Sequence, residues 1–229
     1  MSRLTLPSDA LSPGDLTTTF KVGEDRFLNS LLVSGNGNIC VCGDETQKPF
    51  PLLVWDLNAR KLLYDLRLQH HNFLTQFSAI SHDAHFVVSI AEEINSPAAN
   101  FIVVYDLMSG MLFKKWKPGI NTTAICIIGK LVVNACIDHS IMIWDLSTGD
   151  RKHVLTGHTA AVDRLRTSAT DAPDPLLLSH DSAGADPVLR VWNMDSGESH
   201  PRPSLLLTPL PQVNWSGSSL HQKPSPAVK

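Results

Sequence analysis

The sequence predicts an all-β chain built from small antiparallel sheets that stack face to face. Short segments rich in Val, Ile and Leu alternate with turn signals, and the connections between them are too short for helices. The segment 140–146 is apolar on both of its faces, which indicates a sheet that is covered on both sides. An aromatic residue followed by Asp or Asn recurs along the chain, which indicates repeated units.

Four dipeptides anchor the repeat, and subtraction of their residue numbers places them 50, 39 and 48 residues apart: Trp55-Asp56, Tyr105-Asp106, Trp144-Asp145 and Trp192-Asn193. A glycine follows the last three at one register, where a hairpin turn needs a positive φ. Ala59-Arg60 stands at that place after the first anchor. The spacing therefore predicts one hairpin of the same kind in each unit.

The anchors divide the chain into four units of four strands each, which we expect at 27–66, 73–116, 122–156 and 161–207. Residues 1–26 are expected to be an irregular lead-in. The segments 44–50, 92–100 and 181–187 are expected to be the longer loops, and the last strand of the fourth unit is expected near 204–207. Pro and Ser accumulate beyond it, which predicts a disordered tail at 208–229 because proline cannot donate to a strand ladder.

The period, the four strands per unit and the Trp-Asp dipeptide resemble the WD-repeat family of β-propellers, and Gly157-His158 ahead of Trp192 adds to the likeness. The resemblance covers about residues 27–195. It implies a partial β-propeller of about four blades, each a four-stranded antiparallel sheet. Because propellers of this class close into a ring, an arc of four blades would leave open edges and favour self-association.

Two segments, 51–66 and 100–119, are also similar to the C-terminal WD-repeat region of NACHT and WD-repeat domain-containing proteins. This narrower resemblance rests mainly on residues 50–150. It implies a sensor or autoinhibitory module that acts beside an ATP-binding NACHT domain. The chain has no such domain, so we expect a fragment or a shortened isoform of a larger signalling protein.

The WD-repeat resemblance also implies a hydrogen-bonded chain in the fourth unit, made of His158, Ser179, Asp186 and Trp192. A buried indole N–H needs an acceptor, which a hydroxyl supplies, and an imidazole donates to a carboxylate. Ser, His and Asp also form hydrolytic triads, but Ser179 lies in an apolar strand rather than at an exposed turn, which favours a structural role. The other units depart from this pattern, with Asn134 at the hydroxyl position in the third, and we expect them to depend on apolar packing.

Composition excludes several classes of function. A formal net charge of −3 and a pI near 6.3 argue against a nucleic-acid-binding surface. The sequence has no apolar run that would serve as a signal peptide or cross a membrane, so we expect a cytoplasmic location with no membrane insertion. The four cysteines fit packing residues in a reducing compartment. No nucleotide-binding loop is present and the paired histidines fall in loops, so we expect neither a cofactor nor a metal.

The most consistent function is a non-catalytic scaffold for protein–protein interaction. In a propeller, the loops that join consecutive blades emerge on one face together with the loops between second and third strands. We expect a partner to bind a partly acidic rim on that face, made of Asp44, Glu45, His70, His71, Glu92 and Glu93. The alternative is a propeller hydrolase with a nucleophile in its central channel.

Overall fold

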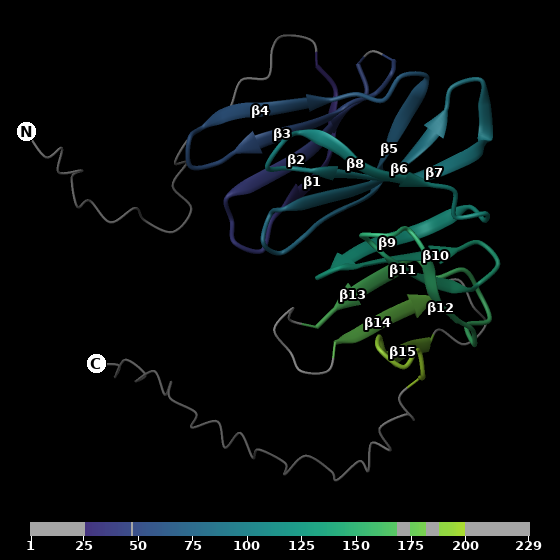
Figure 1. Ribbon diagram of the computed structural model, residues 1–229. Helices are drawn as coiled ribbons and strands as arrows, with labels where there is room; N and C mark the ends of the chain where they lie inside the picture. The colour runs from purple at the N-terminus through teal and green to yellow at the C-terminus, as the bar shows by residue number, and fades with distance from the viewer. Residues whose placement is uncertain (1–25, 47, 169–174, 182–187, 200–229) are drawn as a thin grey trace, which may run out of the picture.

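The computed structural model describes residues 26–46, 48–168, 175–181 and 188–199, which form fifteen strands in four sheets (Figure 1). The first sheet contains β1 (Leu28–Val33), β2 (Ile39–Asp44), β3 (Leu52–Asp56) and β4 (Lys61–Leu66). The second contains β5 (His71–Ile80), β6 (Phe86–Glu93), β7 (Ser96–Asp106) and β8 (Met111–Trp116). The third contains β9 (Thr122–Ile128), β10 (Leu131–Cys136), β11 (Ile141–Asp145) and β12 (Arg151–Leu155). The fourth contains β13 (Arg164–Thr167), β14 (Leu176–Asp181) and β15 (Val188–Asn193).

Within each sheet, strands that follow one another along the chain pair in antiparallel fashion, because their connections are too short for a crossover. The fourth sheet has three strands among the described residues, because the strand expected near 204–207 lies outside them. The elements of the described residues are all strands, so the all-β prediction is confirmed. Within the described part of the chain, no helix is long and apolar enough to span a membrane.

The strand order gives each sheet two distinct ends. We call the end that carries the β4–β5, β8–β9 and β12–β13 connections the connector end, and the opposite end, with the β3–β4, β7–β8 and β11–β12 turns, the hairpin end. The first strands of consecutive sheets, β1, β5, β9 and β13, contact one another, so they line the inner side of the arc. The strands β4, β8 and β12 are fourth in their sheets and lie outside. The four sheets form an open arc that does not close into a ring (Figure 1).

Apolar side chains join the sheets in consecutive pairs. One buried cluster holds the first and second sheets together through residues such as Val54, Phe73 and Val103. A second cluster joins the second and third sheets, and a third joins the third and fourth sheets around Val133, Leu177 and Trp192. The second and third sheets are thus covered on both faces by neighbouring sheets, as the doubly apolar strands predicted. Burial of this kind contributes about 25 cal/mol for each Å² of apolar surface removed from water.

The segment 92–100 differs from the long loop expected there. It is a tight hairpin in which β6 and β7 continue almost to the turn, with Glu92 paired to Asn100 and Glu93 to Ser96. These residues are polar because the ladder extends beyond the stacked core to the solvent-exposed end of the sheet. Apolar patterning cannot detect such an extension, since strand pairing itself needs only the backbone.

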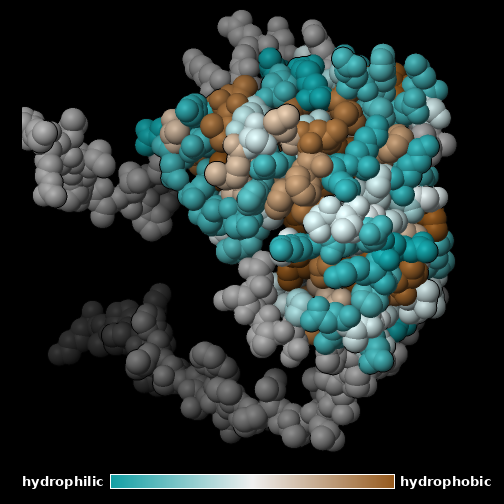
Figure 2. Space-filling view, in the orientation of Figure 1, coloured by the Kyte–Doolittle hydropathy of each residue, from teal (hydrophilic) through white to brown (hydrophobic). Residues whose placement is uncertain are grey.

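The surface of the molecule is not uniformly polar. Figure 2 shows apolar (brown) surface interrupting the hydrophilic (teal) surface. The large exposed apolar side chains include several on the outer strands of the first two sheets and on β1, among them Leu62, Met111, Leu112, Phe113, Leu31 and Val33. A partner or a further sheet would reduce this exposure.

Candidate interaction surface

A buried polar chain links the fourth sheet to the segment that enters it. The Trp192 indole donates to Ser179 Oγ across 2.8 Å, and Ser179 Oγ lies 2.6 Å from His158 Nε2. His158 Nδ1 lies 2.8 Å from Asp181 Oδ2. The structure thus brings together His158, Ser179 and Trp192. The carboxylate beside them is Asp181 at the end of β14, whereas Asp186, assigned to this role from the sequence, lies outside the described residues.

The roles in this chain follow from the chemistry of its members. An ionised Asp181 can only accept, so His158 Nδ1 carries the proton and Nε2 accepts from the Ser179 hydroxyl. Ser179 in turn accepts from the indole. His158, Ser179, Asp181 and Trp192 therefore form a structural relay. It ties together the segment that enters the fourth sheet, β14 and β15.

The same arrangement is unsuited to catalysis. The side chains of His158 and Asp181 are 1% and 0% exposed, and Ser179 is 0% exposed. A nucleophilic serine must reach its substrate beside an oxyanion hole. Here Ser179 is sealed from solvent, and its hydroxyl already donates to His158 and accepts from the Trp192 indole.

Every sheet has a side chain that can form hydrogen bonds at the position equivalent to Ser179. The third sheet has Asn134 at the equivalent place, and the Trp144 indole donates to Asn134 Oδ1 across 2.6 Å. Asn134 Nδ2 donates onward to Thr122 Oγ1 across 3.0 Å. The third sheet therefore contains a polar chain of its own, where apolar packing alone was expected. An amide provides both acceptor and donor, and this capacity was the signal that would have predicted it.

The first two sheets have other hydrogen-bonding contacts at this position. Cys42 lies in hydrogen-bonding reach of Trp55 in the first sheet. In the second, Ser89 pairs instead with Ser78 across 2.7 Å, and the Tyr105 hydroxyl donates to the Arg67 carbonyl oxygen across 3.3 Å. A phenol reaches further than an indole N–H, so it finds its acceptor on a different segment.

The second residue of each anchor dipeptide, an Asp or an Asn, holds the hairpin that follows it. Asp145 Oδ1 accepts from the backbone N–H groups of Ser147 and Thr148, at 2.9 and 3.2 Å. Asp56, Asp106 and Asn193 accept backbone N–H groups of their own turns in the same way. Hydrogen bonds from Ser147 and Thr148 lower the pKa of Asp145, so its carboxylate stays charged in the turn. The anchors thus act within the hairpins, at the end opposite the expected partner rim.

The predicted rim residues all lie at the connector end, but they differ in accessibility. Asp44 is buried, and Arg26 Nη1 lies 2.8 Å from its Oδ2. Although burial opposes it, hydrogen bonds from Thr46 and the charge of Arg26 lower the pKa of Asp44. Glu45 accepts from the Asn29 amide. His70 is exposed and Glu45, Glu92 and Glu93 are half-buried, so these four offer the accessible part of the rim.

His71 belongs to a compact cluster rather than to the open rim. Its Nδ1 donates to the Gln69 carbonyl oxygen across 2.6 Å, so its Nε2 accepts from Lys115 Nζ, 3.0 Å away. Lys115 Nζ also lies 3.9 Å from the centre of the Phe101 ring. Burial lowers the pKa of Lys115, while attraction to Glu93 raises it and repulsion from Lys117 lowers it. The rim is therefore mixed in charge, where a partly acidic surface was expected.

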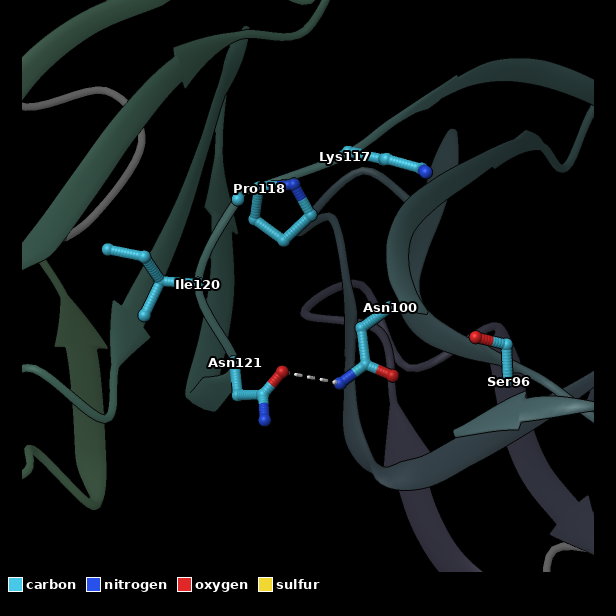
Figure 3. Close-up of a pocket in the computed structure, with 7 residues that line it drawn as sticks. Ser96, Asn100, Lys117, Pro118, Ile120 and Asn121 are labelled. Atoms are coloured by element: carbon cyan, nitrogen blue, oxygen red, sulfur yellow. Dashed lines mark hydrogen bonds between the residues drawn. The ribbon is translucent and has the colours of Figure 1, made fainter. Parts of the chain in front are cut away.

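Two hollows flank the β8–β9 connection. The first has a volume of about 270 Å³ and is lined by Ser96 and Asn100 on one side and by 117–121 on the other (Figure 3). The second has a volume of about 350 Å³ and lies against the third sheet. Ile120 lines both hollows. Within the described ranges, no group of three or more His, Cys, Asp or Glu side chains is placed to hold a metal ion.

Comparison with known proteins supports this architecture. No protein-family model matches the chain. The solved structure of the RRP9 WD40 repeats is similar with a TM-score of 0.57 and 15% identity, over 78% of this chain and 51% of that chain. The computationally designed Ika8 protein is similar with a TM-score of 0.57 and 23% identity, over 76% of this chain and 48% of that chain.

One curated relative, the CCR4-associated factor 4 homolog of Candida glabrata, is 38% identical over 78 residues. That match covers 34% of this chain and 12% of the relative, and the chain spans about half the length of the two similar structures. The chain has the fold of an unclosed WD40-type β-propeller, which confirms the predicted fold class.

Proposed function

We propose that the chain is a non-catalytic scaffold that binds a protein partner at its connector end. One contrast supports this proposal: the Ser–His–Asp constellation is sealed from solvent, while His70, Glu92 and Glu93 remain accessible at the ends of deeply buried strands. Loops held by a rigid sheet present a surface of fixed shape, which lowers the entropy lost on binding. The stacked sheets act as the frame, and the connector end is the docking face.

Charge reversal of the accessible rim tests the proposal. The double variant Glu92→Lys, Glu93→Lys should lose a partner that the unmodified chain captures from cell extract and that mass spectrometry identifies. The matched control is Asp150→Lys, Asp195→Lys, which changes charge equally in exposed turns at the hairpin end. If both double variants capture the same partners as the unmodified chain, the rim is not the docking face.

The alternative function, a propeller hydrolase, predicts a chemically reactive serine, whereas the scaffold proposal predicts none. A fluorophosphonate probe forms a covalent bond with an activated serine, and the buried hydroxyl of Ser179 should not react in the folded chain. Labelling that disappears in Ser179→Ala would favour the hydrolase.

We also infer a narrower role as the sensor propeller of a NACHT-type signalling protein in the cytoplasm. The resemblance of residues 50–150 supports this role. If it is right, the chain should bind a separately expressed NACHT domain of such a protein and lower its ATPase rate, and a fluorescently tagged chain should remain in the cytoplasm. A NACHT domain whose ATPase rate and mobility are unaffected by the chain would exclude it.

A further inference from the structure

The two hollows beside the β8–β9 connection form a candidate ligand site that the rim residues do not include. Asn100 and Asn121 face each other across the first hollow, while the Ile120 side chain points away toward the third sheet (Figure 3). Because Ile120 lines both hollows, they adjoin. A ligand that passed over Ile120 from one hollow into the other would run from the connector end along β12 toward Arg151, the first residue of that strand.

The first hollow contains an unsatisfied acceptor. Asn100 Nδ2 donates to Asn121 Oδ1 across 3.3 Å, but Asn100 Oδ1 is buried and has no hydrogen-bond partner among the residues that the structure describes. A buried carbonyl oxygen without a donor loses its hydrogen bonds to water and gains none in exchange, so a ligand that donates to it is favoured. A peptide N–H is a donor of suitable size, and side-chain amides commonly bind extended peptide backbone in this way.

Each hollow also has a cation that makes no ion pair with a carboxylate among the described residues. Lys117 lines the first, and its Nζ lies 5.1 Å from the centre of the Phe101 ring. Arg151 lines the second and has no ion pair within the described part of the chain. One acid, Asp138, also lines the second hollow, where it accepts from the Ser140 backbone N–H and hydroxyl at 3.1 and 2.6 Å. Lys117 and Arg151 thus each offer a positive charge to a carboxylate at their own end of the site, while Glu92 and Glu93 lie beside the first hollow, paired with its lining residues Asn100 and Ser96.

The second hollow adds an apolar surface. Ile120, Met142 and Val154 line it beside Arg151, and Val154 is exposed. A side chain with an apolar body could cover Val154 while a neighbouring carboxylate meets Arg151. Burial of such a side chain against Val154 removes apolar surface from water and favours binding.

We propose that these two hollows bind an extended acidic peptide segment of a partner protein. This inference rests on the proposed scaffold function and names the chemistry that the docking face recognises. A backbone N–H of the segment donates to Asn100 Oδ1, an acidic side chain pairs with Lys117, and a second pairs with Arg151. An apolar residue of the segment packs on Ile120 and Val154.

A random library of nine-residue peptides on beads tests this directly with the full chain as probe. The peptides that bind should contain Asp and Glu in clear excess over Lys and Arg, relative to the unselected library. The Kd of a selected peptide, measured by fluorescence polarisation, should rise about tenfold in Lys117→Glu and in Arg151→Glu, since a charge-assisted hydrogen bond is worth about 1.5–3 kcal/mol. Asn100→Leu should also weaken binding.

Controls separate electrostatics at the hollows from general charge and folding effects. Lys130→Glu places the same reversal in the exposed β9–β10 turn at the hairpin end and should leave the Kd unchanged. Lys117→Gln and Arg151→Gln should weaken binding less than the reversals while melting like the unmodified chain. The proposal is overturned by a library without selected peptides, by selected peptides without acidic excess, or by an excess that survives both reversals.

Failure of the acidic-peptide site can be distinguished from failure of the scaffold proposal. If the hollows select no acidic peptide but the rim variant Glu92→Lys, Glu93→Lys still abolishes capture of a partner, the scaffold stands and only this site falls. If capture is unaffected by every connector-end variant and no peptide binds, both proposals fail.

Discussion

Ser179 connects the aromatic anchor of the fourth sheet to the segment that enters it, through two hydrogen bonds in a fully buried position. We expect Ser179→Ala to lower the free energy of unfolding by about 2–3 kcal/mol, because it leaves the Trp192 N–H and a His158 nitrogen unpaired. Urea denaturation measures this. Thr159→Ala, at an exposed position nearby, should change stability by less than about 0.5 kcal/mol. Equal effects of the two variants would contradict the structural role of the relay.

The buried thiols make a second prediction at the scale of residues. Burial raises the pKa of Cys40 to about 11 and that of Cys136 to about 11, from 9.0. Since the folded pKa lies above the unfolded one, the stabilisation is complete below pH 9 and is lost as the pH rises toward 11. Unfolding free energies measured from pH 8 to 11 should fall accordingly, and replacing both cysteines with Ala should flatten the curve. A curve that stays as steep would show that other groups cause the loss.

The sequence predicts His158, Ser179 and Trp192 in the relay, and the structure brings these three together, while the predicted acid, Asp186, lies outside the described residues. Spacing from Trp192 indicated Asp186, and that spacing spans the connection between β14 and β15, whose length varies between sheets. The structure uses Asp181, two residues beyond Ser179 on the same strand, where β-strand alternation keeps both side chains on one face. Asp44 holds the equivalent place in the first sheet, two residues beyond Cys42, and it pairs with Arg26.

The anchor hairpins are the elements that repeat most faithfully. Gly110, Gly149 and Gly197 have φ values of 69°, 78° and 72°, and Arg60 adopts 55° at the same place in the first sheet. The sequence pattern predicted the glycine turns correctly. It left the first turn open, since a non-glycine residue reaches this conformation only at a cost of about 1–2 kcal/mol.

Two alanine substitutions test the hairpins. Gly149→Ala should cost about 1–2 kcal/mol from backbone strain alone, because its new Cβ would lie 3.4 Å from the nearest atom, on the flexible Lys114 side chain. Gly110→Ala should cost more, because its Cβ would lie 2.5 Å from the Tyr64 ring. Thermal melting of both variants gives the comparison. A larger loss in Gly149→Ala would contradict the packing of β4 against the β7–β8 turn.

At the scale of the whole molecule, the doubly apolar strands correctly predicted that the sheets cover one another. Chain order and twist then place the first strands inside and the connections at one end. The accessibility of the rim could not be predicted, because it depends on partners far along the chain, such as Lys115 for His71 and Arg26 for Asp44. Side-chain type alone does not reveal which charges are already paired.

The open arc leaves the outer sheets with one face not covered by another described sheet. Cys40, Cys42, Leu53 and Trp55 form a separate apolar cluster in the first sheet, and Leu31 on β1 is 73% exposed. Exposed apolar surface and unpaired strand edges favour association with another sheet. We therefore expect the chain to bind copies of itself when no partner is present.

Sedimentation velocity of the purified chain across a range of concentrations tests the central claim, an unclosed stack of mutually covering sheets, most directly. The account predicts that the weight-average sedimentation coefficient rises with concentration as copies associate through their outer sheets. A single monomeric species at every concentration, with one cooperative melting transition, would contradict it.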